Sequence, residues 1–221
     1  MIDILLPVLS RPQNAQKVVD SIHHATELPH TILFICSRGD EAQIDACVGT
    51  AAVVLIIDGG DFEYPRKINH AATYPVRADP HPWLFLGADD LDFKPGWDTA
   101  AIAEHERTGK LVIGTNDLSN PTVIRGLHAT HSLVHRRYVT EQGTIDEPGL
   151  VLYPGYHHNF CDNEFVGTAQ HRGEWSFAAA SHVQHHHPIW GTAKDDRTYE
   201  LGRRTYHADS RTWRKRRRLW R

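Results

Sequence analysis

Cysteine is scarce in this chain of 221 residues, and its three cysteines lie far apart. Cys36, Cys47 and Cys161 form no C-x-x-C pair, so the sequence indicates neither a disulfide framework nor a cysteine zinc site. A composition of this kind is typical of a reducing compartment, and we expect the protein in the cytoplasm.

Long apolar runs are absent as well. The first one, in MIDILLPVLSRP, is about seven residues long, which is too short to cross a bilayer. Neither a basic leader nor a small-residue cleavage site accompanies it, so we expect no signal peptide and no membrane span. No internal repeat or long linker divides the chain, and its 40% hydrophobic and 23% charged residues are ordinary for a globular domain.

Positive charge is concentrated at the end of the chain. The net charge is −3, yet residues 203–221 hold nine basic residues against one acid, Asp209, so the preceding part is strongly acidic. The final stretch, RTWRKRRRLWR, places two tryptophans around a run of five cations. Such a run is either a solvated helix face or a contact for phosphates or another polyanion. We predict a single domain, 1–202, followed by a basic helical tail, 203–221.

Apolar segments alternate with helical periods in the first half of the chain. Strands are predicted at 2–10, 30–37, 51–58, 82–88 and 110–117. Helices are predicted between them at 12–25, 40–49, 64–74 and 96–109. This alternation predicts an α/β fold with a mostly parallel central sheet flanked by helices. In such sheets ligands bind beyond the carboxyl ends of the strands, where Ser10–Arg11, Ser37–Arg38 and an acidic cluster are expected.

The second half of the chain is less regular. Residues 129–139 suggest a strand that runs into a helix, and 143–161 form a loop rich in glycine, proline and aromatics, of the kind that often covers a site. A helix is predicted at 162–173 and a strand with a bend at 175–191. From Lys194 onward the pattern predicts one or two helices.

The acidic cluster is in the stretch LFLGADDLDFKPGWD, where an apolar strand runs into Asp89, Asp90 and Asp92. Carboxylates this close repel one another unless a positive group lies between them. Asp90 and Asp92 form a D-x-D pair of hard oxygen donors, which can bind Mg²⁺ or Mn²⁺ while a diphosphate and water fill the other positions. Acidic residues are also common before helices, where they act as caps. This motif alone therefore does not distinguish a metal site from a capping role.

Several motifs, taken in order, resemble the GT-A-fold glycosyltransferases, especially their large family-2-like group. The strand followed by G-A-D-D, an aromatic and P-G-W is similar to their metal-binding turn, and ILLPVLSRPQNAQKVVDSI looks like their opening strand and helix. YPRKINHAA resembles the segment near the sugar nucleotide, and FCDNEFVGTAQHRGEW resembles the acidic acceptor segment. HHHPIWGTAKDDRTY is similar to the C-terminal metal histidine and closing helix. The resemblance runs from residue 2 to about 200.

The resemblance implies a role for each matching position. Asp162 would be the general base, Lys67 would meet the diphosphate of a UDP-sugar, and Asn69 would meet the ribose or the sugar. With the polar strand ends included, the predicted donor-binding residues are Pro7, Leu9, Arg11, Ser37, Lys67, Asn69 and Asp89. The predicted ligands of Mn²⁺ or Mg²⁺ are Asp90, Asp92 and His187.

Some of these assignments have alternatives. Asp89 and Asp90 could form the functional pair and leave Asp92 structural. His185, His186 and His187 offer three candidates for one ligand; His185 and His187 share a face of a strand, and we favour His187. Asp162 could equally cap its helix.

The implied reaction is a single displacement that inverts the anomeric carbon. The metal ion and Lys67 would stabilise the leaving diphosphate, and Asp162 would take a proton from the acceptor hydroxyl. The rivals are a nucleotidyltransferase, whose usual glycine-rich loop is missing from PVLSRPQNA, and a non-catalytic binder of nucleic acid or glycan, which would not need the acidic residues.

The charge and the aromatic residues of the C-terminal segment bear on the identity of the acceptor. An aromatic-containing cationic tail suits a polyanion such as DNA. Phages carry glycosyltransferases that modify hydroxymethylated bases, and such an enzyme needs phosphate contacts and room for a flipped base. We therefore predict a modified base in DNA as the acceptor, in the host cytoplasm if the protein is viral. A protein or glycan acceptor is the alternative.

Overall fold

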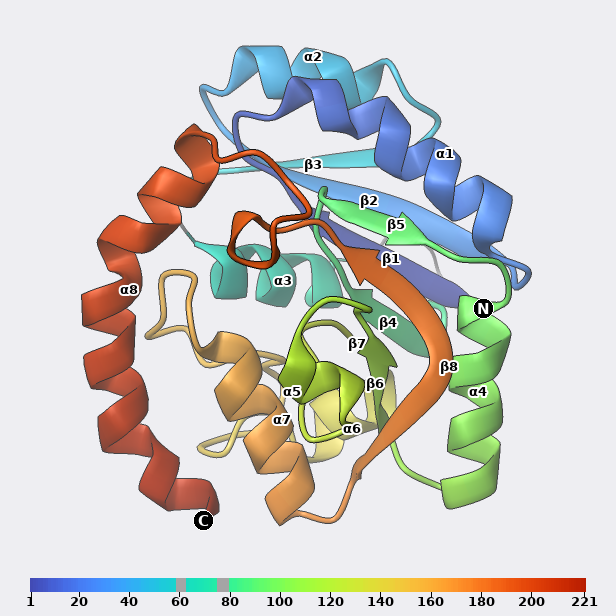
Figure 1. The fold of residues 1–221 in the computed structure, drawn as a ribbon, viewed down its shortest axis with the longest axis vertical. Coiled ribbons are helices and arrows are strands. Elements are labelled where there is room, and N and C mark those ends of the chain that lie inside the picture. Colours follow the sequence, from blue (N-terminus) through green and yellow to red (C-terminus); the bar gives the residue numbers. More distant parts are fainter. Residues whose placement is uncertain (59–62, 75–79) are drawn as a thin grey trace.

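The computed structural model describes residues 1–58, 63–74 and 80–221, and within them eight strands form one curled sheet (Figure 1). The strands are β1 (Ile2–Pro7), β2 (His30–Ser37), β3 (Val53–Ile57), β4 (Trp83–Leu86), β5 (Leu91–Phe93), β6 (Val112–Asn116), β7 (Ser132–His135) and β8 (Trp175–His185). The helices are α1 (Ala15–Ala25), α2 (Glu41–Val48), α3 (Tyr64–Thr73), α4 (Trp97–Thr108), α5 (Pro121–Ile124), α6 (Arg136–Glu141), α7 (Cys161–His171) and α8 (Arg197–Arg216). Short 3₁₀ helices are η1 (Pro12–Asn14), η2 (Pro188–Trp190) and η3 (Arg217–Trp220).

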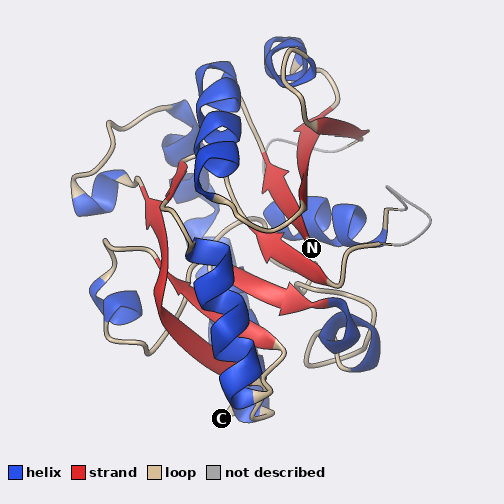
Figure 2. Ribbon diagram, turned by 90° about the vertical axis from the view of Figure 1, so that its right-hand side faces the viewer, coloured by secondary structure: helices blue, strands red, loops and turns tan. Residues whose placement is uncertain are grey.

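β1 is buried along its whole length, which requires a layer of helices on each face of the sheet. Its alternating side chains meet two different cores. Ile4 and Leu6 pack with the buried faces of α1, α2 and α4. Leu5 points to the other face and packs with α3, α6 and α7. Figure 2 shows helices on both sides of the strands.

The strand order is β3-β2-β1-β4-β7-β6-β8-β5. The first four strands in this order pair in parallel, as predicted. β7 is antiparallel to both of its neighbours, whereas β6 and β8 pair in parallel. The predicted α/β fold with a mostly parallel sheet is confirmed, with an antiparallel insertion that the sequence pattern did not reveal.

β5 was not predicted, and it determines where the acidic cluster lies. After β4 the chain turns through Gly87–Asp90 and enters β5, which pairs antiparallel with the end of β8. In this register Leu91 lies opposite His185. The pairing therefore brings the acidic turn next to the histidines that end β8, although about ninety residues separate them in sequence.

The basic C-terminal segment is packed against the domain. α8 runs along one side of the molecule in Figure 1 and passes without a break through the predicted boundary after residue 202. The buried carboxylate of Asp209 accepts hydrogen bonds from the backbone N–H groups of His157, His158 and Asn159. Beyond α8, Trp220 is buried against Gly167 of α7. These contacts attach the segment to α7 and to residues 157–159. In the described part of the chain, no helix is long and apolar enough to cross a membrane.

Candidate functional site

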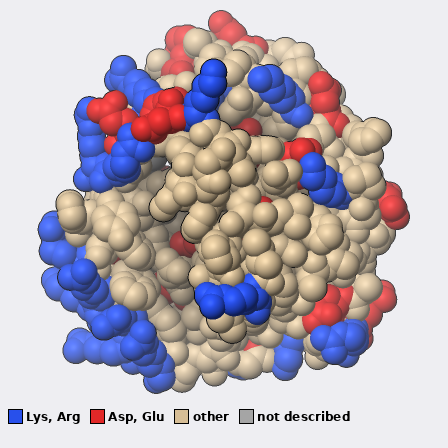
Figure 3. Space-filling view, viewed as in Figure 1, with Lys and Arg blue, Asp and Glu red and all other residues tan. Residues whose placement is uncertain are grey.

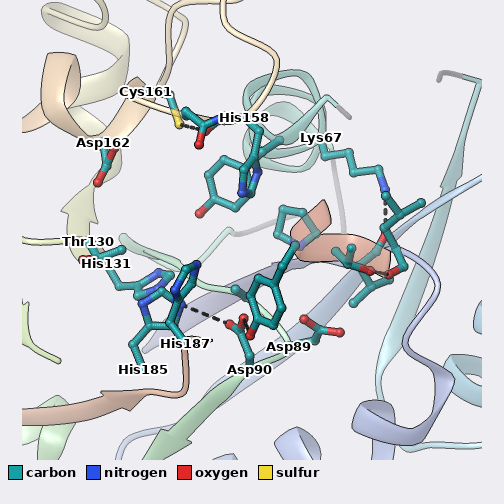
Figure 4. Close-up of a pocket in the computed structure, with 18 of the residues that line it drawn as sticks. Lys67, Asp89, Asp90, Thr130, His131, His158, Cys161, Asp162, His185 and His187 are labelled. Carbon is teal, nitrogen blue, oxygen red and sulfur yellow. Dashed lines mark hydrogen bonds and ion pairs between the residues drawn. The ribbon is translucent and has the colours of Figure 1, made fainter. Parts of the chain in front are cut away.

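A cavity of about 350 Å³ opens at the carboxyl ends of β1 and β4 (Figure 4). Its other walls come from the end of β8, from the residues just before β7, and from the first turns of α3, α7 and α8. The predicted site residues that line it are Pro7, Leu9, Arg11, Lys67, Asp89, Asp90, Asp162 and His187. The cavity therefore lies where ligands bind in α/β sheets of this kind.

Arg11 is the positive group beside the acidic cluster. Its Nη1 donates to Asp89 Oδ1 at 3.2 Å and to Asp90 Oδ2 at 3.1 Å. Its Nε donates to Asp196, the N-cap residue of α8, at 2.9 Å, and its guanidinium lies 4.0 Å from the centre of the Tyr199 ring. Burial opposes its charge, but the carboxylates raise the pKa of Arg11 above its ordinary value, so it stays a cation.

The pKa values of the two carboxylates beside Arg11 are shifted in opposite directions. Burial and the charge of Asp90 raise the pKa of Asp89 to about 7. Burial also acts against ionisation of Asp90, but His185 and Arg11 outweigh it and hold the pKa of Asp90 well below its usual range. Of these two neighbouring carboxylates, Asp90 is therefore firmly ionised, whereas the charge of Asp89 depends on its surroundings.

His185 is the histidine nearest to the acidic pair. Its Nε2 lies 3.5 Å from Asp90 Oδ1, and Asp90 raises the pKa of His185 against the effect of burial. His187, which the sequence favoured as a ligand, also lines the cavity, but its Nδ1 accepts a hydrogen bond from Ile189 N and caps η2. The geometry therefore favours His185 over His187 as the partner of Asp90.

Asp92 does not lie in the cavity. On β5 its neighbours in sequence point to one face and Asp92 to the other. Its carboxylate accepts from Ser21 Oγ of α1 at 3.1 Å and pairs with Lys94 Nζ at 2.5 Å. The hypothesis that Asp92 binds the metal has no support from its position, and the alternative register, Asp89 with Asp90, is the one that faces the cavity.

Three further sequence-predicted residues differ in their position relative to the cavity. Lys67 lines the cavity, but it is buried and donates to Val8 O at 2.6 Å, and burial lowers its pKa to about 8. Asn69 lies outside the cavity and binds the backbone of Val151 and Leu152, so it holds the 143–161 loop against α3. Ser37 is buried at the end of β2 and also lies outside the cavity.

Asp162 lies in the first turn of α7, on the side of the cavity opposite Lys67 in Figure 4. His128 Nε2 lies 3.0 Å from Asp162 Oδ2, and this contact holds the pKa of Asp162 below its ordinary value although burial would raise it. The carboxylate is thus ionised at neutral pH and can accept a proton.

The sequence did not single out three residues of this site. His128, which orients Asp162, is one of seventeen histidines and has no distinguishing pattern around it. The Tyr199 hydroxyl lies 2.9 Å from Asp90 Oδ2 and 2.8 Å from His186 O, so its one proton is available to either acceptor. His131 is buried against His185 with ring centroids 5.1 Å apart, and burial lowers its pKa to about 4. Each of these residues contacts a segment that is distant from it in sequence.

The donor atoms around Asp90 fit a divalent cation as one part of a larger coordination shell. Asp90 Oδ1 is buried, accepts no hydrogen bond from any described residue and faces His185 Nε2. Asp89 Oδ2 is buried near Asn14 without a hydrogen bond of normal geometry. Among the described residues no three His, Cys, Asp or Glu side chains gather closely enough to hold a metal by themselves. A cation here would need oxygen ligands from a bound diphosphate or water as well.

No protein-family model matches this sequence, and no curated protein is similar to it in sequence. Solved structures are similar in fold. Glucosyl-3-phosphoglycerate synthase from Mycobacterium tuberculosis, in complex with Mn²⁺, UDP-glucose and phosphoglyceric acid, is 10% identical with a TM-score of 0.62, over 91% of this chain and 74% of that one.

Two other glycosyltransferases give similar values over smaller shares of their length. Mannosyltransferase PcManGT from Pyrobaculum calidifontis, with GDP-Man and Mn²⁺, is 10% identical with a TM-score of 0.62, over 86% of this chain and 58% of that one. S. aureus TarS 1-349 is 9% identical with a TM-score of 0.59, over 82% and 59%. At this identity the similarity establishes the fold, and the GT-A fold implied by the sequence motifs is confirmed.

Proposed function

We propose that the protein is a metal-dependent, inverting glycosyltransferase that moves a sugar from a nucleotide sugar, a UDP-sugar, to an acceptor hydroxyl. One observation carries this proposal: a single cavity at the carboxyl ends of β1 and β4 is lined both by the Asp90–His185 pair and by Asp162, whose carboxylate His128 contacts from outside that cavity. The Asp90–His185 pair suits a cation and a diphosphate, and Asp162 suits proton removal.

The donor half of the cavity has the groups that a nucleoside diphosphate requires. Pro7 and Leu9 provide the strand end beside the nucleotide, and Arg11 and Lys67 provide cations for the diphosphate. Asp90 and His185, with Asp89 beside them, would hold Mn²⁺ or Mg²⁺, which when bound neutralises charge on the departing diphosphate. The glycosyltransferase structures solved with Mn²⁺ and UDP-glucose or GDP-Man support this donor class.

The acceptor half carries the base. Asp162 accepts the proton of the acceptor hydroxyl while its oxygen forms the bond to the anomeric carbon. The bond from that carbon to the diphosphate breaks, and its electron pair leaves with the nucleoside diphosphate. His128 keeps the carboxylate oriented and ionised. A single displacement of this kind inverts the anomeric configuration.

The proposed acceptor is a hydroxymethylated base in DNA, which would make the protein a DNA-modifying enzyme of the phage type acting in the host cytoplasm. Lys and Arg side chains gather along the α8 side of the molecule (Figure 3), and this distribution supports a polyanionic acceptor. Residues 203–221 would then contact phosphates while 1–202 carry the reaction. A protein or glycan acceptor is the second candidate.

A thermal-shift series with nucleotide sugars, with and without Mn²⁺, tests the proposed reaction class. We expect one donor to raise the melting temperature only when the cation is present, because both bind the folded state alone. Nucleoside triphosphates that stabilise instead would favour a nucleotidyltransferase, and no response to any donor would leave a non-catalytic binder.

A substitution then tests the base. Asp162→Asn should lower sugar transfer by a factor of about 10²–10⁴ and leave donor-induced stabilisation unchanged. The matched control is Asp45→Asn, at an exposed position of α2 away from the cavity. Wild-type transfer by Asp162→Asn would contradict the assignment.

A further inference from the structure

A second cavity, of about 500 Å³, lies directly beside the first. Asp162 and Asn163 line both cavities. The walls of the second come from the α5 region, from the outer face of α7, and from the C-terminal part of the chain beyond residue 212. Its volume is in the range that holds a ligand the size of one nucleotide or a phosphorylated sugar.

The second cavity is polar and has the electrostatic character of an anion site. Arg217 and Arg221 line it together with His171, and Asp162 is the only acid among the described residues of its wall. That acid already contacts His128, which also faces the cavity. An anion entering here would meet positive charge that one paired carboxylate does not cancel.

Among the residues that the structure describes, the arginines of this wall have no carboxylate partners of their own. Nearby Arg216 is not available to a ligand, because it pairs with Glu164 and Asp146 and lies over the ring of Tyr153. Within the described residues, neither Arg217 nor Arg221 makes an ion pair, and the guanidinium of Arg217 lies 5.0 Å from the centre of the Trp213 ring. Arg217 is therefore a positioned cation that is free to bind a ligand.

The fold holds Arg217 in place. It begins η3, and three residues later Trp220 is buried against α7, where a Cβ added to Gly167 would be 2.2 Å from Trp220 Nε1. On the other side of Arg217, the Arg216–Glu164 pair fixes the end of α8 to the same helix. Both anchors act within one turn of Arg217, so the cation is part of a preformed wall.

Building on the proposed function, we propose that the second cavity is the acceptor site and that it recognises a phosphate group on the acceptor through Arg217. The accepting hydroxyl then reaches Asp162 at the junction of the two cavities, where the donor sugar arrives from the other side. Arg221 and His171 surround the same phosphate, and Asn120, Thr122 and Gln170 offer hydrogen bonds to the remainder of the acceptor.

A phosphodiester of a DNA strand and the phosphate of a small phosphorylated alcohol share this chemistry. They differ in what else they require. A strand needs additional cations outside the cavity, whereas a small phosphorylated acceptor needs only the cavity wall. The two sources are therefore separated by the probe and by the dependence of binding on salt.

The test uses the full chain and three variants, Arg217→Ala, Arg217→Lys and Arg214→Ala. Arg214 is the matched control, because it is an exposed cation near the end of α8, three residues before Arg217, and lines neither cavity. The probes are inorganic phosphate, glycerol 3-phosphate and a single-stranded oligonucleotide that contains 5-hydroxymethylcytosine. Binding is measured by calorimetry or fluorescence at several salt concentrations, and unfolding curves without ligand verify that each variant is folded.

We expect Arg217→Ala to weaken binding of the phosphate probes at least about tenfold, Arg217→Lys to retain most of it, and Arg214→Ala to match wild type with the two small probes. With the oligonucleotide, Arg217→Ala should also reduce the slope of log affinity against log salt by about one. Tight binding of glycerol 3-phosphate with weak, salt-insensitive oligonucleotide binding would identify the small acceptor as the source.

Equal phosphate affinity in Arg217→Ala and wild type, or no phosphate binding by the wild type, would overturn the acceptor-site proposal. Donor-induced stabilisation is measured in the same variants and should be unchanged. If no donor stabilises the wild type while phosphate binding still depends on Arg217, the result counts against the glycosyltransferase proposal instead. The two failures are therefore distinguishable.

Discussion

Arg11 and Asp90 form an ion pair inside the cavity, with Arg11 Nη1 3.1 Å from Asp90 Oδ2, while Asp90 Oδ1 accepts no hydrogen bond within the described part of the chain. Only one of the two carboxylate oxygens of Asp90 is thus hydrogen-bonded. One oxygen is held by a guanidinium that is itself anchored by Asp196, and the other faces His185. This arrangement keeps Asp90 ionised and fixes its orientation in the cavity, and a metal-binding carboxylate needs both before a cation binds.

The Asp90→Asn variant tests that assignment. It should lose the part of donor-induced stabilisation that depends on Mn²⁺, and sugar transfer should fall at least about 100-fold, because the charge facing the diphosphate is gone. Thermal-shift measurements with and without Mn²⁺ give the first quantity, and release of nucleoside diphosphate gives the second. Asp92→Asn is the matched control and should keep both, since Asp92 contacts Ser21 and Lys94 outside the cavity. A metal response lost in Asp92→Asn alone would reverse the two roles.

Donor affinity should depend on pH through Lys67. Burial lowers the pKa of Lys67 from 10.5 to about 8, so its ammonium form, which attracts a diphosphate, is lost as the pH rises through 8. We expect donor affinity to fall by up to about tenfold between pH 7 and 9, as measured by calorimetry with Mg²⁺. Lys67→Met should bind more weakly at pH 7 and show a flatter profile. An equal slope in both proteins would assign the titration to another group.

The same shift affects stability with the opposite sign. Between pH 8 and 10.5 the unfolded chain keeps the Lys67 proton that the folded chain has released. Folding stability from this group therefore rises with pH in that window, and the rise should be absent in Lys67→Met. Denaturant unfolding at pH 8 and pH 10 measures the difference.

Asn69→Ala distinguishes a structural role from a role in donor binding. The substitution leaves the N–H groups of Val151 and Leu152 without their acceptor, so we expect a loss of about 1–3 kcal/mol of stability. Donor affinity should change less than about twofold, because Asn69 lies outside the cavity. Asn69→Asp keeps an acceptor oxygen and should recover part of the stability. A large loss of donor affinity with normal stability would restore the ribose contact that the sequence suggested.

Gly167→Ala probes the attachment of the C-terminal segment. A Cβ at this position would lie 2.2 Å from Trp220 Nε1, so either the ring or helix α7 must move. We expect a loss of about 1–3 kcal/mol, or about 2–4 °C in melting temperature for each kcal/mol. Gly49→Ala is the control, since its new Cβ would make only ordinary contacts near 3.5 Å. Unchanged stability in Gly167→Ala would mean that Trp220 is not anchored there.

The sequence was most informative where a local pattern has one structural outcome. Residues 30–37 are an apolar run in a chain that alternates strands with helices, and β2 occupies those positions. β5 escaped prediction because a three-residue strand with an acid at its centre has no periodicity of its own. It exists because β8 offers a partner edge about ninety residues later in the chain.

The direction in which a side chain points was less predictable than its segment. The sequence does not distinguish the three aspartates Asp89, Asp90 and Asp92. Only the pairing of β5 with β8 turns Asp92 away from the cavity. Lys67 and Asn69 are two positions apart on α3, so one faces the cavity while the other faces the 143–161 loop.

The sequence alone determined the α/β class, most of the strands, and the concentration of acids and histidines in segments that could meet. Hydrophobic periodicity and strand-end polarity are local, so they survive without knowledge of the fold. The tertiary structure alone decided that Arg11 neutralises the acidic pair, that His185 is the histidine nearest to Asp90, and that the basic tail forms the wall of a second cavity. These facts depend on contacts between residues far apart in the chain, which burial, strand pairing and charge fix only once the whole domain has closed.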